Sequence, residues 1–340
     1  MFSANVSKHI LRFKTPAGTS KAILTEKLSW IINLYDRSFP EKHGNGECSI
    51  IPGLSPESPE EFEILIAEMC ENPVDNILSG FSDLNDFPAG RAGLEMAWID
   101  LTVGTEGIYF PSAFTEGKTG IPINGLIWMG SKENMLQQAY EKIDEGFRCI
   151  KLKIGALDFQ DDLDLLRTLR ASFGSHEIEI RVDANGAFKT DEALTKLNQL
   201  ARFDLHSIEQ PIMPGQTEAM AKLCELSPVP VALDEELFTP SADLLKATML
   251  NTIRPQYLVL KPSMLGGFSK CQDWIALAGS MQIGWWITSA LESNIGLNAI
   301  AQFTSTLDNQ NYHGLGTGKL FSNNFPSKLK VEQGQLYFIG

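Results

Sequence analysis

Hydrophobic and polar positions follow two different patterns along this chain. In the first part, strand-like runs at 9–14 and 21–34 flank a segment of turn residues, 15–20, which predicts a hairpin with a mobile tip. Helical patterns follow at 56–70 and 90–101. The first of these has a serine, a proline and two acids where a helix start favours them.

After about residue 121, short apolar runs alternate regularly with amphipathic helical stretches. We expect strands at 121–127, 148–154, 177–183, 205–209, 229–234, 256–261 and 282–288, and a last short one near 312–315. Helical patterns fill the gaps, for example at 132–146, 157–173, 191–201 and 267–280. This alternation predicts an α/β fold with a parallel (β/α) barrel rather than an open sheet. The tail at 328–338 is expected to be a strand that could return to the first domain.

Composition narrows the possible partners. The chain has 340 residues, 43% hydrophobic and 21% charged, which is ordinary for a globular enzyme of roughly two domains. Its net charge of −14 argues against nucleic acid as a partner. An anionic substrate stays possible, because a metal ion and local lysines can reverse the charge inside one pocket.

The cysteines and the apolar runs indicate a compartment. Five scattered cysteines form no CxxC pair, so neither a zinc site nor a disulfide framework is expected. No secretory signal is visible and no apolar run reaches about 18 residues, so we expect no membrane partner and a cytoplasmic location. The sequence does not indicate an oligomeric state.

Ionisable residues stand at the C-terminal ends of five consecutive predicted strands. Their order is lysine, aspartate, glutamate, aspartate, lysine, at Lys151 with Lys153, Asp183, Glu209, Asp234 and Lys261. Side chains two apart on a strand share a face, so both lysines of the first strand point inward. In a barrel these ends meet at one mouth, where active sites lie.

Three converging carboxylates would repel one another unless a cation lay between them. An all-oxygen set made of Asp183, Glu209 and Asp234 suits Mg²⁺, with Mn²⁺ as a possible substitute. Lysines on either side of such a metal could act as general bases when neutral. One acid at a strand end is usually a helix cap or an ion-pair partner, and one Lys-x-Lys pair is usually a solvated edge. Inward charges on five consecutive strands favour a catalytic site.

These strand-end motifs resemble those of the enolase superfamily, muconate-cycloisomerase subgroup. The motifs are KLKIG (151–155), RVDANGAF (181–188), IEQPI (208–212), ALDEEL (232–237) and LVLKPSMLGG (258–267). The resemblance covers nearly the whole chain. It implies a (β/α)₇β barrel at 116–320 under an α+β capping domain, formed by 1–115 with 321–340 returning to it.

Within that subgroup, the chain resembles the o-succinylbenzoate synthases of menaquinone biosynthesis. Four segments carry this resemblance, at 12–27, 122–130, 288–303 and 313–321. It implies a small carboxylate substrate, 2-succinyl-6-hydroxy-2,4-cyclohexadiene-1-carboxylate, that loses water to give 2-succinylbenzoate. Lys153 would be the base, Lys261 would stabilise the anionic intermediate, and Lys151 would orient the carboxylate and lower the pKa of Lys153.

The remaining site residues follow from the same resemblance. Asn185 and Glu235 are expected to support the metal ligands. The succinyl tail is expected to contact Ser263, Ser289, Gly316 and Thr317, with Thr19 and Ser20 closing from the cap. Arg181 could steer the substrate or could pair with a neighbouring acid.

Two alternatives stay open. An N-acylamino-acid racemase, a dipeptide epimerase or a cycloisomerase would share the core motif, because lysines on both faces also serve a racemase. The epimerase alternative is weaker, since segment 314–318 lacks the acidic pair that would hold an amine. A binding protein that has lost catalysis is disfavoured, because simple binding needs no base.

Overall fold

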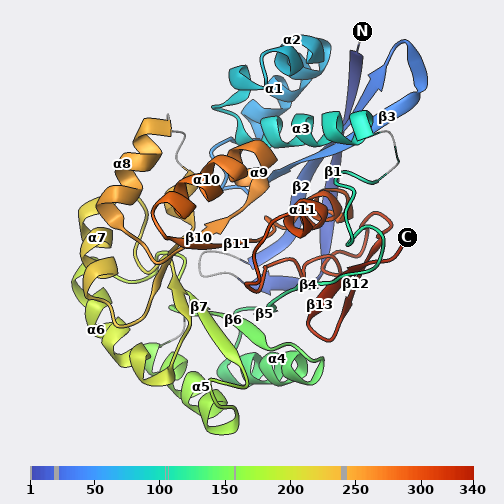
Figure 1. Ribbon diagram of the computed structural model, residues 1–340. Helices are drawn as coiled ribbons and strands as arrows, with labels where there is room; N and C mark the ends of the chain where they lie inside the picture. Colours follow the sequence, from blue (N-terminus) through green and yellow to red (C-terminus); the bar gives the residue numbers. More distant parts are fainter. Residues whose placement is uncertain (1, 19–22, 104, 106, 157, 239–242) are drawn as a thin grey trace.

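The computed structural model describes residues 2–18, 23–103, 105, 107–156, 158–238 and 243–340 (Figure 1). The chain forms an antiparallel sheet with its own helices and a curved parallel sheet surrounded by helices. In the described part of the chain, no helix is both long and apolar enough to cross a membrane.

The N-terminal sheet has three antiparallel strands, β1 (Phe2–Gly18), β2 (Ile23–Asp36) and β3 (Phe39–Ile50), in that order. Three helices cover it, α1 (Pro59–Glu71), α2 (Pro73–Leu78) and α3 (Pro88–Val103), with a 3₁₀ turn at Ser82–Leu84. Ser58 caps α1 by accepting a hydrogen bond from the backbone N–H of Glu61, as the sequence predicts.

Strand β3 was absent from our sequence prediction. Its polar residues and glycines look like a loop, but the glycines allow α3 to approach closely. A Cβ atom at Gly44 would lie 2.0 Å from the carbonyl oxygen of Ala97, and one at Gly46 would lie 1.9 Å from that of Gly93. Packing against α3 therefore explains the glycines in this strand.

The parallel sheet contains seven strands in chain order, and all its pairings are parallel. They are β5 (Gly125–Ile127), β6 (Cys149–Lys153), β7 (Glu179–Asp183), β8 (Ser207–Glu209), β9 (Val231–Leu233), β10 (Tyr257–Leu260) and β11 (Gly284–Ile287). A helix follows each strand: α4 (Lys132–Asp144), α5 (Phe159–Ser172), α6 (Thr190–Leu200), α7 (Thr217–Leu226), α8 (Asp243–Ile253), α10 (Phe268–Ser280, after the short α9, Pro262–Leu265) and α11 (Asn294–Ser305). The predicted α/β barrel is confirmed.

The eighth strand position is occupied by a short segment that closes the barrel. His313 bridges to Ile123 and Gly314 bridges to Thr288, both in parallel orientation. The backbone N–H of Asn124 donates to the carbonyl of His313, and that of Gly314 donates to the carbonyl of Ile287. The predicted strand near 312–315 is therefore present as two bridges.

The tail forms a hairpin rather than one strand. β12 (Leu329–Glu332) pairs with β13 (Gln335–Phe338), and β13 pairs on its other side with β4 (Ile121–Pro122). The return to the cap is made earlier, where Phe321 bridges to Phe13 and the N–H of Ser322 donates to the carbonyl of Arg12. The domain boundaries at 115/116 and 320/321 stay a prediction.

Candidate active site

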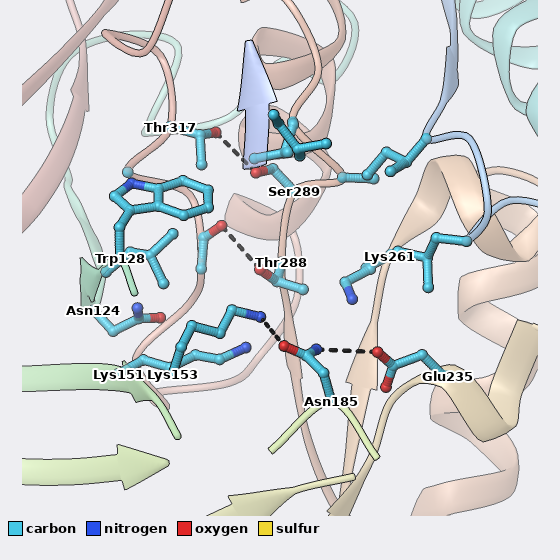
Figure 2. Close-up of a pocket in the computed structure, with 18 of the residues that line it drawn as sticks. Asn124, Trp128, Lys151, Lys153, Asn185, Glu235, Lys261, Thr288, Ser289 and Thr317 are labelled. Carbon is cyan, nitrogen blue, oxygen red and sulfur yellow. Dashed lines mark hydrogen bonds between the residues drawn. The ribbon is translucent and has the colours of Figure 1, made fainter. Parts of the chain in front are cut away.

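A cavity of about 350 Å³ lies where the C-terminal ends of the barrel strands face the cap. Leu24 of β2 and the loop 51–54 after β3 form one side of it. The ends of β5, β6, β7, β9, β10 and β11, with the closing segment, form the others. Its lining consists of Leu24, Ile51, Pro52, Gly53, Leu54, Asn124, Leu126, Trp128, Lys151, Lys153, Asn185, Glu235, Lys261, Thr288, Ser289, Ala290, Leu291, Gly314, Gly316 and Thr317. Figure 2 shows Lys151 and Lys153 on one side of the cavity and Lys261 on another.

The predicted acids lie directly beneath these lysines. Strand register places Lys153 beside Asp183 and Asp183 beside Glu209. Lys151 Nζ lies 2.9 Å from Asp183 Oδ2 and 2.6 Å from Glu209 Oε1, and Lys153 Nζ lies 2.7 Å from Asp183 Oδ2. Asp183 and Glu209 are buried, so the lysines separate them from the cavity.

Lys261, at the end of β10, forms the corresponding contact from the far side. Its ammonium group is ion-paired with Asp234, which follows β9 and is fully buried. The ammonium also lies 5.2 Å from the centre of the Phe238 ring. The structure thus brings together all six residues that the sequence places at the strand ends.

Asn185 connects Lys153 to Glu235. Lys153 Nζ donates to Asn185 Oδ1 at 2.8 Å, and Asn185 Nδ2 donates to Glu235 Oε1 at 3.0 Å (Figure 2). Asn185 has a φ of 44°, in the left-handed region that asparagine tolerates better than most residues. Asn185 therefore holds the ammonium group of Lys153, and its backbone N–H donates to Asp183 Oδ1 at 2.9 Å. That Asn185 and Glu235 support metal ligands stays a prediction.

The electrostatics of the site are those of opposite charges buried together. Burial alone would raise the pKa of Asp183, but Lys151 and Lys153 hold it below its usual value. Burial alone would lower the pKa of Lys151, but Asp183 and Glu209 raise it above its usual value. Burial and the neighbouring Asp183 raise the pKa of Glu209. Any cation beside these carboxylates therefore stabilises their charged form.

The donor set fits a divalent cation. Oδ1 of Asp234 and Oε2 of Glu235 are buried oxygens without a hydrogen-bond partner. Three carboxylates from adjacent strands supply the oxygen ligands that a hard cation prefers. In the described residues, no three acidic, histidine or cysteine side chains are arranged so that they could hold a metal ion as they stand, and lysine ammonium groups contact the acids instead. Metal binding would therefore move these ammonium groups.

The predicted tail-binding residues divide into two groups. Ser289, Gly316 and Thr317 line the cavity, and the hydroxyls of Ser289 and Thr317 are 2.8 Å apart (Figure 2). Ser263 is buried outside the lining and donates to Glu292 Oε1 at 2.6 Å. Thr19 and Ser20 lie outside the described residues.

Arg181 occupies a deeper layer of the barrel. It precedes Asp183 by two residues on β7, so it lies on the same face but further from the mouth. Its Nε donates to Glu179 Oε1 at 2.7 Å, and its guanidinium carbon lies 4.1 Å from the centre of the Trp286 ring. It does not contribute to the lining of the cavity. The structure thus gives it the second of its two predicted roles, pairing with an acid.

Some lining residues were missed by the sequence interpretation. Loop 51–54, Ile-Pro-Gly-Leu, contributes four of them, and its Pro-Gly turn signal after an apolar run could have indicated a loop at the barrel mouth. Trp128 follows Leu126 by two residues, so alternation along the first barrel strand could have placed it in the site.

Comparison with known proteins identifies the family. Residues 134–338 match the family described as "Enolase C-terminal domain-like". The chain belongs to the enolase superfamily. An o-succinylbenzoate synthase from Desulfotalea psychrophila is 45% identical over 96% of both chains. The crystal structure of MenC from Desulfotalea psychrophila LSv54 superposes with a TM-score of 0.86, at 41% identity over 99% of both chains.

More distant members match less of the chain. The L-Ala-D/L-Glu epimerase from Bacillus subtilis is 24% identical over 65% of this chain and 60% of its own length. The o-succinylbenzoate synthase and the MenC structure, by contrast, match nearly the whole chain, which confirms the expected resemblance to the o-succinylbenzoate synthases. Enolase-superfamily enzymes generally depend on a divalent metal, with a lysine or histidine base.

Proposed function

We propose that this chain is a lyase, an o-succinylbenzoate synthase that dehydrates 2-succinyl-6-hydroxy-2,4-cyclohexadiene-1-carboxylate to 2-succinylbenzoate in menaquinone biosynthesis. The main support is the near full-length similarity to an o-succinylbenzoate synthase, combined with lysines on two sides of one cavity above three buried acids. A cytoplasmic location and the absence of nucleic-acid and membrane partners stay predictions.

We propose that Asp183, Glu209 and Asp234 hold Mg²⁺, for which Mn²⁺ could substitute. When bound, Mg²⁺ would neutralise negative charge on the substrate carboxylate. Asp234 Oδ1 is a buried acceptor without a partner, which supports this assignment. The ammonium groups of Lys151, Lys153 and Lys261, which pair with these acids, would then be released toward the substrate.

The three lysines have different roles in this reaction. Lys153 removes the proton from the carbon that bears the carboxylate, and the electron pair moves toward that carboxylate as an enediolate. The pair then returns to expel hydroxide from the neighbouring carbon. Protonated Lys153 gives its proton to that hydroxide, so the products are water and the aromatic ring. Lys261, on the other side of the cavity, stabilises the negative charge, and Lys151 orients the carboxylate.

The direct test is to supply the cyclohexadiene substrate with Mg²⁺ and to follow the aromatic product by its ultraviolet absorbance. Formation of 2-succinylbenzoate that stops with a chelator and returns with Mg²⁺ would support the proposal. No product from folded, Mg²⁺-loaded protein would overturn it.

A racemase of N-acylamino acids is the second candidate, because Lys153 and Lys261 approach the cavity from different sides (Figure 2). Such an enzyme exchanges the α-proton of an N-succinylamino acid with solvent. Incubation in deuterated water would detect that exchange. Exchange without dehydration would favour the racemase.

A further inference from the structure

A buried carboxylate of the cap holds the beginning of a barrel helix. Glu47 on β3 is fully buried and accepts hydrogen bonds from the backbone N–H groups of Ser293 at 2.8 Å and Gly296 at 2.9 Å. The Ser293 hydroxyl also donates to it. A Cβ atom at position 296 would lie 2.9 Å from Glu47 Oε2, so the glycine permits this approach. A carboxylate here also matches the positive end of the α11 dipole.

The same face of the cap sheet extends this contact to the cavity wall. Lys27 on β2 donates to Ser29 at 2.9 Å and also to Ser49, and these two serines are register partners on β2 and β3. Ser29 donates to Glu47 at 2.6 Å, and Ser49 donates to the carbonyl oxygen of Ala290 at 3.1 Å. Ala290 lines the cavity.

Glu292 fixes the same wall from the barrel side. Its carboxylate accepts the backbone N–H of Ala290 at 2.8 Å and the hydroxyl of Ser263 at 2.6 Å. Both backbone groups of Ala290 are therefore held by this network. The next residue, Leu291, has a φ of 60°, a conformation that costs about 1 kcal/mol or more in a residue with a side chain. A wall residue kept in that conformation must be held by its surroundings.

We propose that Lys27, Glu47 and Glu292 are positioning residues that set the cavity wall Ser289–Leu291 for the substrate tail. This inference deepens the proposed function and rests on it. Ser289 lies on the side of the cavity away from Lys151 and Lys153 (Figure 2), so the network should affect tail binding more than proton transfer. Buried charged side chains such as Lys27, Glu47 and Glu292 often stabilise a fold no more than apolar side chains of the same size would. Their presence here therefore supports a role other than stability.

Glu95 on α3 offers a matched control, because it binds the start of another barrel helix, α10. Glu95 on α3 is a second buried cap glutamate, and it accepts the backbone N–H groups of Phe268 at 2.7 Å and Ser269 at 3.1 Å at the start of α10. Arg91 donates to the hydroxyl of Ser269 at 3.1 Å. In the described part of the chain, none of these partners lines the cavity. Glu47 and Glu95 therefore both bind the backbone N–H groups at the start of a barrel helix, but only the network of Glu47 extends to a residue that lines the cavity.

The experiment compares Glu47→Gln with Glu95→Gln, and the milder Ser49→Ala with Ser269→Ala. Steady-state kinetics of the dehydration give KM and kcat, and hydrogen–deuterium exchange reports on peptides that span 288–296 and 266–272. We expect Glu47→Gln and Ser49→Ala to raise KM about tenfold, the size of one lost hydrogen bond, with kcat changed less than about threefold. Exchange at 288–296 should rise in both. The control variants should leave KM unchanged and alter only 266–272.

The outcomes separate the two proposals. An inactive wild-type enzyme would overturn the proposed function and the tail assignment with it. An active wild type in which Ser49→Ala leaves both KM and exchange at 288–296 unchanged would overturn the network alone. A fall in kcat without a rise in KM would also overturn it, because the network would then act on the chemistry. If Glu47→Gln does not fold, Ser49→Ala decides.

Discussion

Lys151 and Lys153 approach the same atom, Oδ2 of Asp183, at 2.9 Å and 2.7 Å. They stand two residues apart on β6, so both point into the barrel, and Lys151 reaches on to Glu209. One carboxylate oxygen thus balances two ammonium groups. A cation bound to Asp183 would compete with both, which couples metal binding to the release of the lysines toward the substrate.

The first prediction concerns the three acids. Asp183→Asn, Glu209→Gln and Asp234→Asn should each lower kcat/KM at limiting Mg²⁺ by about 100-fold or more, because each removes a charged ligand from a site that tolerates ligand loss poorly. Titration of Mg²⁺ against initial rate measures the effect. Glu141→Gln on the exposed face of α4 is the control. Near wild-type rates in any of the three would show that the residue is not a ligand.

The second prediction concerns Asn185, which joins Lys153 to Glu235. Asn185→Gly keeps the left-handed backbone free of strain and removes only the amide. We expect kcat to fall about tenfold, since Lys153 loses one of its two hydrogen-bond acceptors. Gln333→Gly is a matched control, because Gln333 has a φ of 48° in the exposed β12–β13 turn. Equal kcat values in the two variants would remove Asn185 from the mechanism.

The part of the site that the sequence predicted is the part fixed by short-range rules. Alternation along a strand places Lys151 and Lys153 on one face, and the order of parallel strands places Asp183 and Glu209 beside them. Once the barrel was inferred, these positions required no knowledge of long-range packing. The same holds for Lys261 at the end of β10, whose predicted place opposite the other lysines agrees with the structure.

The residues that the sequence did not place depend on contacts between distant segments. Ser263 binds Glu292, 29 positions away, and so turns from the cavity. Glu47 meets Ser293, 246 positions away, and no local pattern marks a glutamate between polar strand residues as a helix cap. The sequence of β3 is typical of a loop because it contains glycines, but these glycines allow α3 to pack closely on the strand and do not mark a turn. These features follow from contacts between segments far apart in the sequence, within the barrel, within the cap and between the two, which sequence periodicity does not encode.

The third prediction concerns acid stability. Burial lowers the pKa of His313 to about 4, while its unfolded value is about 6.5. Below about pH 6.5 His313 binds a proton in the unfolded chain, whereas in the folded chain it stays neutral until about pH 4. The free energy of unfolding should therefore fall across this window, by about 3 kcal/mol for this histidine.

His313→Asn tests this assignment, because Asn Oδ1 can replace Nδ1 as the acceptor for the Ile287 N–H. Urea unfolding at pH 7 and pH 4.5 should show a smaller loss of stability in His313→Asn than in the wild type. Exposed His176, changed to asparagine, is the control. An unchanged difference between the two pH values in His313→Asn would show that His313 does not cause the acid sensitivity.

The fourth prediction separates the two catalytic lysines. In the dehydration only Lys153 must transfer a proton, whereas Lys261 must only be positive and near the ring. Lys261→Arg keeps the charge and should retain part of the activity, with some loss because arginine is larger and planar. Lys153→Arg cannot act as a base at neutral pH, so its kcat should be about 10²–10⁴-fold below that of the wild type.

The same pair of variants distinguishes the synthase from a racemase. In a racemase each lysine removes the proton from one enantiomer, so Lys153→Arg and Lys261→Arg should both abolish racemisation of N-succinylamino acids, and each should stop α-proton exchange of one enantiomer. In the synthase the two variants should differ by at least about tenfold in dehydration, because proton transfer falls to one lysine and charge to the other. The measurement is dehydration and deuterium exchange on the same protein samples, with Lys142→Arg on α4, a half-buried lysine outside the cavity lining, as the control. Wild-type dehydration in Lys153→Arg would refute the role of Lys153, which contacts Asn185 and lines the cavity.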